Sequence, residues 1–169
     1  MKALAKSFVY AWQGFLYCIK NERNMRIHFV IMVYMYSFLF FFDFFKLTKV
    51  EITVIFIANT IVFMGELINT AVESTINLVE KRYNKFAKIA KDTAAAAVLV
   101  GAVFSFAIGI TLLWQPAAFR ALYEYYKTHI YMLVALIISL VLSCFFIFSE
   151  DKNEKEKERR NQKRKVKNK

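Results

Sequence analysis

The sequence predicts an all-α membrane protein, because it is strongly apolar, contains four long apolar stretches and has few helix-breaking residues. Of its 169 residues, 58% are hydrophobic and 17% aromatic, more than an ordinary soluble domain carries. Each apolar stretch approaches or exceeds the ~20 residues with which a helix crosses the hydrocarbon of a bilayer. The stretches are residues 27–45, 52–79, 93–113 and 130–148. One proline and four glycines leave little to interrupt them.

The segment before the first stretch, residues 1–20, predicts an amphipathic helix on the membrane surface. Its apolar residues recur at steps of three and four, which places them on one helix face: Leu4, Phe8, Ala11, Phe15 and Ile19. The lysines fall on another face. No apolar core followed by a small-residue cleavage site is evident, so we do not expect a targeting peptide.

Basic residues alternate between the flanks of the stretches, and this predicts the orientation. The segment before the first span and the loop between the second and third each carry five Lys or Arg, whereas the other two loops carry two each. Residues 150–169 hold ten more. Since Lys and Arg are retained on the cytoplasmic side, both termini are expected there.

A polar stripe marks the end of the second stretch, which is longer than one span and should emerge at the cytoplasmic interface. Glu66, Asn69 and Glu73 lie within roughly 60° of one another on a helix. Ionisable groups in a membrane segment cost a few kcal/mol, so they normally face a cavity, a partner or water. A functional site is the first interpretation. The alternatives are a stripe that only holds helices together, or an interfacial turn already in water.

Other charged residues reach the same depth from neighbouring spans. Glu22 precedes the first span, and Lys91 and Asp92 begin the third. Two carboxylates such as Glu22 and Glu73, together with nucleotide phosphates, suffice to hold Mg²⁺. Lys91 can neutralise phosphate charge, and Glu66 can take the proton of an attacking hydroxyl. Phosphoryl transfer asks mainly for positioning and charge stabilisation, so the absence of a Gly-rich phosphate loop does not exclude it.

Four short blocks carry a resemblance to a known family. They are Tyr10-Ala-Trp-Gln-Gly14, Asn21-Glu22 with Arg26, Glu66-Leu-Ile-Asn-Thr-Ala-Val-Glu73, and Ala87-Lys-Ile-Ala-Lys91-Asp92 before an alanine-rich helix. With these blocks, residues 5–115 resemble the small integral-membrane diacylglycerol kinases of bacteria and their undecaprenol kinase relatives. The resemblance implies transfer of the γ-phosphate of MgATP to a membrane lipid alcohol at the cytoplasmic face of the bacterial inner membrane. It also implies a homotrimer whose active sites form between subunits, each subunit contributing a surface helix and three spans.

The family's site residues map onto this sequence one by one. Glu66 matches the general base, and Glu22 and Glu73 match the metal-binding glutamates. The remaining matches are contacts to ATP: Asn69, Lys91 and Asp92 to the nucleotide and its phosphates, and Tyr10 to the adenine.

The sequence also departs from the family pattern. Asn77 stands where an aspartate is common, and Glu80 and Asn84 stand where better-known members have glycine and histidine. These changes spare the metal and base residues but affect the predicted nucleotide-binding loop. We therefore expect a kinase core over residues 1–115, an additional outer loop and fourth span over 116–149, and a basic cytoplasmic tail over 150–169.

The sequence leaves alternatives open for the identity of the lipid substrate and for the activity itself. The run Asn21-Glu-Arg-Asn-Met-Arg-Ile-His28 resembles the undecaprenol kinase branch and favours undecaprenol over diacylglycerol, although a lone histidine at a membrane boundary is often structural. The competing function is a non-catalytic scaffold that keeps the fold. A channel is disfavoured because the outer halves of the spans are nearly free of charge.

The basic tail predicts attraction to anionic lipid rather than to nucleic acid. The two cysteines, Cys18 and Cys144, have neither the spacing of metal ligands nor that of a disulfide framework.

Overall fold

The computed structural model describes residues 2–80 and 82–149, and its regular structure is entirely α-helical, as predicted. No strand occurs among the described residues. The helices are α1 Lys2–Asn21, α2 Arg23–Phe41, α3 Lys49–Val79, α4 Lys85–Leu113, α5 Pro116–Thr128 and α6 Ile130–Phe148. The predicted basic tail lies outside the described residues.

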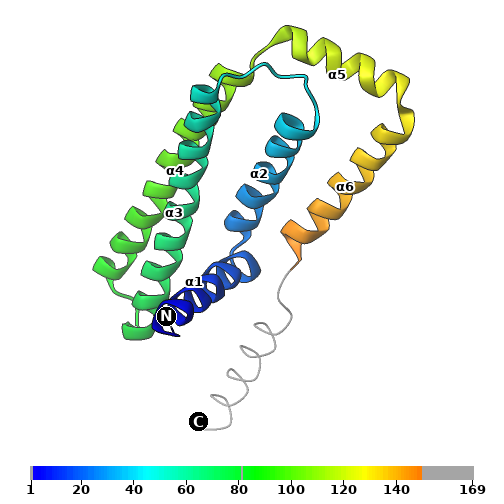
Figure 1. Ribbon diagram of the computed structural model, residues 1–169. Coiled ribbons are helices and arrows are strands. Elements are labelled where there is room, and N and C mark those ends of the chain that lie inside the picture. Colours follow the sequence, from blue (N-terminus) through cyan, green and yellow to red (C-terminus); the bar gives the residue numbers. More distant parts are fainter. Residues whose placement is uncertain (1, 81, 150–169) are drawn as a thin grey trace.

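Four of these helices are long and apolar enough to cross a membrane, namely α2, α3, α4 and α6. Figure 1 shows the four running between two ends of the molecule, with α1 lying across one end and α5 across the other. The predicted surface helix is confirmed as a continuous helix, α1. It meets the bundle through Phe15, whose ring centroid lies 6.3 Å from that of Phe63 on α3.

Among the described helices, α3 and α4 form the most extensive pair. Small residues allow their backbones to approach closely. A Cβ placed on Gly65 would lie 3.6 Å from the Cα of Val98, and one placed on Gly101 would lie 3.5 Å from the Ile61 side chain. Because Gly65 directly precedes Glu66, this close packing fixes the part of α3 that carries the polar stripe.

The first span differs from its predicted bounds. The apolar run continues to Phe45, but α2 ends at Phe41 and Phe42 takes an extended conformation. The aromatic rings beyond the helix pack against α5 instead, with Phe42 5.4 Å from Tyr125 and Phe45 6.0 Å from Phe119 between centroids. An apolar run alone does not distinguish a helix end from an aromatic loop that packs at the interface.

The segment between the third and fourth spans is more regular than a plain outer loop, because it forms α5. Pro116 occupies the first turn of this helix, where its missing N–H is not needed. The Gln115 side chain joins the loop before α5 to the loop before α3: its Oε1 accepts from the Lys46 N–H at 3.1 Å and its Nε2 donates to the Lys46 carbonyl at 3.2 Å. The helix thereby carries the chain from α4 across to α6 (Figure 1).

Candidate functional site

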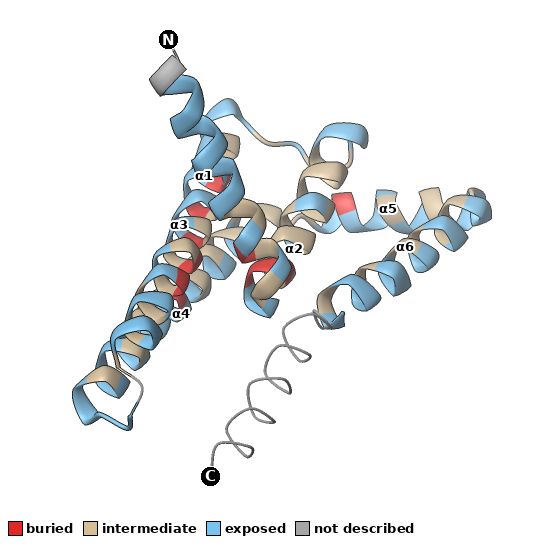
Figure 2. Cartoon of the chain, turned by 90° about the horizontal axis from the view of Figure 1, so that it is seen from below, coloured by how far each residue is buried: buried red, intermediate tan, exposed pale blue. Residues whose placement is uncertain are grey.

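The site centres on Glu66, whose side chain is 3% exposed in the middle of α3. It belongs to the buried stripe of that helix, which comprises Ile55, Ala58, Val62, Glu66 and Thr70. Figure 2 shows buried residues gathered along α3 and near its meeting with α1 and α2. The Oε1 atom of Glu66 is buried and accepts no hydrogen bond from any described residue. A buried carboxylate oxygen without a donor is costly, so it indicates a place where an additional donor binds.

His28 on α2 is the nearest basic partner of this carboxylate. Its Nε2 lies 3.4 Å from Oε1 of Glu66, and its side chain is 24% exposed. The contact has the distance of an ion pair without the geometry of a hydrogen bond, so Oε1 keeps its capacity to accept. The sequence did not predict this role for His28, and the only signal was its place at the end of the run from Asn21.

Cys18 of α1 is buried near Glu66 and was not predicted as part of the site. Burial raises the pKa of the Cys18 thiol, the nearby carboxylates of Glu22 and Glu66 act in the same direction, and a hydrogen bond with Thr70 opposes them. These influences place Glu22 and Glu66 close enough to Cys18 to act on it electrostatically. The helices α1, α2 and α3 also contact one another in pairs.

The predicted metal ligands lie on separate helix segments. Glu22 is the N-cap residue of α2 and is half-buried. Glu73 is half-buried two turns after Glu66, and its Oε1 accepts from Nδ2 of Asn69 at 3.2 Å. Over residues 2–80 and 82–149, no group of three or more His, Cys, Asp or Glu side chains could hold a metal ion. Both glutamates are hard oxygen donors, which fits Mg²⁺, since this ion needs only one or two carboxylates when phosphates supply other ligands.

The predicted phosphate contacts lie where α3 and α4 meet. The Nζ of Lys91 donates to Oδ1 of Asn77 at 2.6 Å. Because Asn77 is neutral, this contact leaves the charge of Lys91 uncompensated, whereas an aspartate would neutralise it. Asp92 forms an exposed ion pair with Lys88 one turn earlier on α4.

Two residues that differ from the family pattern, Glu80 and Asn84, form the turn between α3 and α4. Asn84 caps α4 by accepting from the N–H of Phe86 at 2.9 Å, and its amide donates to Glu80 at 3.2 Å. These contacts stabilise the α3–α4 turn. Tyr10, the predicted adenine contact, is 66% exposed on α1 and is not enclosed by the described residues.

An apolar groove leads away from His28 along α2, α3 and α4 towards the end of the molecule where α5 lies. Its volume is about 390 Å³. Val62 and Ala58 line it one and two turns from Glu66, and Trp114 and Phe119 line its far end. Glu66 does not line the groove itself, but it contacts His28, which does. A groove of this character suits a long apolar molecule that carries one polar group.

Comparison with known proteins identifies the family. The profile of the family described as prokaryotic diacylglycerol kinase matches residues 9–113. The chain belongs to this family. It is 38% identical over 117 residues to the diacylglycerol kinase of Synechocystis sp., covering 67% of this chain and 63% of that relative. It is also 38% identical over 109 residues to the undecaprenol kinase of Bacillus subtilis, covering 63% of this chain and 85% of that relative.

The match to the prokaryotic diacylglycerol kinase family spans α1 from residue 9, α2, α3 and α4. It therefore contains Tyr10 and all of the other predicted site residues. The helices α5 and α6 lie beyond it.

Proposed function

We propose that the protein is a lipid kinase that transfers the γ-phosphate of ATP to the hydroxyl group of a membrane lipid alcohol. The observation that carries the proposal is the buried Glu66 carboxylate, which has an oxygen without a donor and lies near the end of the apolar groove. A lipid in the groove would present its hydroxyl there. The cytoplasmic face is proposed for this end of the molecule from the distribution of Lys and Arg.

The reaction requires one proton acceptor and strong neutralisation of phosphate charge. The lipid oxygen attacks the γ-phosphorus, the bond to the ADP oxygen breaks, and the hydroxyl proton passes to Glu66. His28 lies 3.4 Å from this carboxylate and holds it towards α2. For the phosphates, Lys91 carries a positive charge. The Nδ2 of Asn69 donates one hydrogen to Glu73 and has a second that it can donate.

A magnesium ion, when bound, would neutralise negative charge on the phosphates and orient the γ-phosphate. Glu22 and Glu73 are the residues proposed to hold it, since their oxygen atoms match the preference of this ion. We also propose a homotrimer, as the family resemblance implies. A site composed between subunits would bring together residues that one chain leaves on separate helices.

The proposed lipid is undecaprenol rather than diacylglycerol. The run from Asn21 to His28 resembles the undecaprenol kinase branch, and its last residue lies against Glu66. One of the relatives at 38% identity is named undecaprenol kinase.

The test is transfer of labelled γ-phosphate from ATP by the purified protein, with undecaprenol and diacylglycerol supplied in parallel and with magnesium present or chelated. We expect magnesium-dependent labelling that favours undecaprenol. A preference for diacylglycerol would overturn the lipid assignment alone. No labelling of either lipid by a properly assembled protein would favour a non-catalytic scaffold.

A further inference from the structure

The fourth span touches the rest of the molecule in a restricted way. Among the described helices, α6 makes appreciable contact only with α2 and α5. Any influence of α6 on the site near Glu66 must therefore pass through α2, or through α5 at the other end of the molecule. Because α2 carries His28 and directly follows its N-cap Glu22, it is the direct route.

Arg26 ties the end of α6 to the first turn of α2. Its side chain is buried, and its Nη1 donates to the carbonyl of Phe146 at 3.2 Å, to the hydroxyl of Ser149 at 3.1 Å and to the carbonyl of Ser149. The last carbonyls of a helix have no partner within the helix and form the negative end of its dipole. At the C-terminal end of α6, the guanidinium of Arg26 donates hydrogen bonds to these carbonyls and places a positive charge against the dipole.

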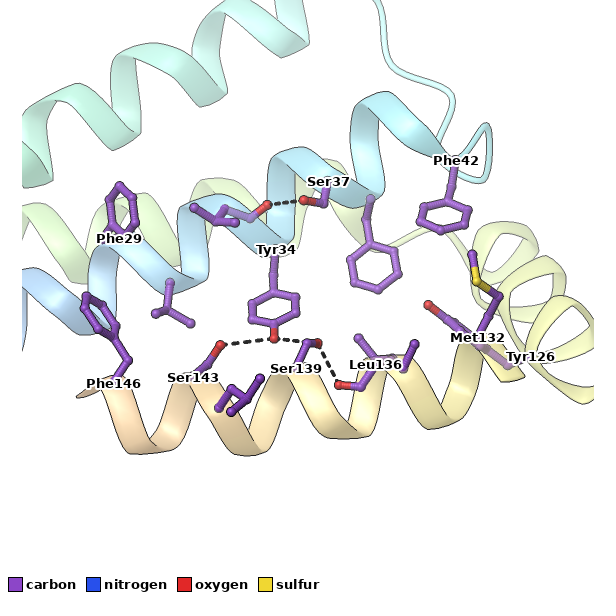
Figure 3. A pocket seen from close by; sticks show the side chains of 15 residues that line it. Phe29, Tyr34, Ser37, Phe42, Tyr126, Met132, Leu136, Ser139, Ser143 and Phe146 are labelled. Carbon is purple, nitrogen blue, oxygen red and sulfur yellow. Dashed lines mark hydrogen bonds between the residues drawn. The ribbon is translucent and has the colours of Figure 1, made fainter. Parts of the chain in front are cut away.

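A second polar contact lies further along the same pair of helices. The hydroxyl of Tyr34 donates to Oγ of Ser139 at 2.8 Å and lies 3.1 Å from Oγ of Ser143. Figure 3 shows Tyr34 pointing from α2 to these two serines across a cavity of about 730 Å³. Since this cavity separates much of the two apolar faces, the polar contacts at Arg26 and Tyr34 fix the position of α6 against α2.

The contacts of α2 lie on opposite sides of the helix. Arg26 and His28 are two residues apart, which corresponds to roughly 200° around an α-helix. Arg26 therefore holds α6 on one side while His28 meets Glu66 of α3 on the other. The first two turns of α2 are gripped between α6 and α3.

We propose that α6 is a positioning element for the active site and that Arg26 is the positioning residue through which it acts. By holding the side of α2 that faces α6, the Arg26 contact keeps His28 against Glu66 and fixes the first turn that follows Glu22. The inference rests on the proposed kinase function, because its consequence is measured as turnover. It assigns a role to a helix that lies outside the family match.

The contact between Arg26 and the end of α6 can be perturbed by a substitution at Ser149, which leaves the sequence of α2 unchanged. In full-length protein, Ser149→Lys places a cation against Arg26, whereas the matched variant Ser149→Asp offers a carboxylate to the same guanidinium. The Nε of Arg26 is buried without an acceptor among the described residues, so the aspartate has a donor to meet. We expect Ser149→Lys to lower kcat roughly 5- to 50-fold with the KM for ATP unchanged, since small misplacements of reacting groups cost rate rather than nucleotide binding. Ser149→Asp should keep the wild-type kcat.

The position of α6 is followed independently of activity. Spin labels at Phe104→Cys on α4 and Phe145→Cys on α6, in a Cys144→Ser background, report the distance between α6 and the bundle; both phenylalanines are exposed. Ser149→Lys should broaden this distance distribution, and Ser149→Asp should not. A charge exchange completes the test: Arg26→Glu with Ser149→Lys should recover at least roughly fivefold in kcat over Arg26→Glu alone.

The outcomes separate the two proposals. Unchanged kcat in Ser149→Lys despite a broadened distance distribution, equal losses in the lysine and aspartate variants, or no recovery on charge exchange would each overturn the positioning role. A wild-type protein that labels neither lipid would refute the kinase function and with it the catalytic consequence of the contact, while the spin-label distances would still report whether Arg26 holds α6.

Discussion

Replacing Glu66 by glutamine tests the centre of the proposed site with little change of shape. The side chain is 3% exposed, so an amide of the same size fits where the carboxylate lies and introduces no water. It removes the only buried carboxylate among the described residues and leaves His28 in place. Because general base catalysis contributes roughly 10²- to 10⁴-fold, kcat should fall by about that factor, equivalent to ~3–5 kcal/mol in the activation barrier.

The assay is single-turnover and steady-state transfer of labelled γ-phosphate to the preferred lipid, with the protein purified in detergent. The matched control is Glu51→Gln, the same substitution in the same helix, where the glutamate only takes part in the capping box with Thr48. The control should lose some thermal stability but keep the wild-type turnover. If Glu66→Gln kept more than half of the wild-type kcat while assembled normally, Glu66 would not be the base and the reasoning from its unpaired oxygen would fail.

Four further predictions follow from the same geometry. His28→Gln should lower kcat roughly tenfold and lower the melting temperature slightly, because the buried carboxylate loses its basic partner; an unchanged kcat would make the 3.4 Å contact incidental. Lys91→Met should raise the KM for ATP roughly tenfold, as expected for a lost charge-assisted contact, and an effect on lipid KM alone would contradict its assignment. Thr48→Ala should destabilise the protein by about 0.5–2 kcal/mol in a detergent melting experiment and leave kcat unchanged. Alkylation of Cys18 in a Cys144→Ser background should be slow at neutral pH and accelerate only above the usual pKa of a thiol, because burial raises the pKa and only the thiolate reacts; rapid alkylation at pH 7 would refute its burial beside the site.

The sequence predicted the helices better than their ends and contacts. Apolar runs identified each candidate spanning helix among the described residues, but the run through Phe45 overshot the end of α2, since aromatic residues pack equally well in a loop. The helix α5 was not predicted, because the segment from Pro116 was expected to be a loop, whereas a proline in the first turn is compatible with a helix.

For the site, spacing along one helix grouped Glu66, Asn69 and Glu73, and the structure has one hydrogen bond within that group, from Asn69 to Glu73. It did not reveal that Glu66 faces inward to His28 and Cys18. Contacts between helices depend on how the helices are rotated against each other, and periodicity within one helix does not contain this information. The roles of the metal and nucleotide residues stay predictions.

The place where α6 ends has an electrostatic consequence for the proposed binding of ATP. Its last turn lies beside Arg26, at the end of the molecule that holds Glu66 and α1, so whatever follows Ser149 starts there. Residues 150–169 carry ten Lys or Arg and five Asp or Glu, a net charge of +5. A positive charge of this size raises the local concentration of a polyanion such as ATP, and salt screens it over a distance of about 8 Å at physiological ionic strength. The apparent affinity for ATP should therefore weaken as salt is added, and more steeply than the catalytic residues alone would cause.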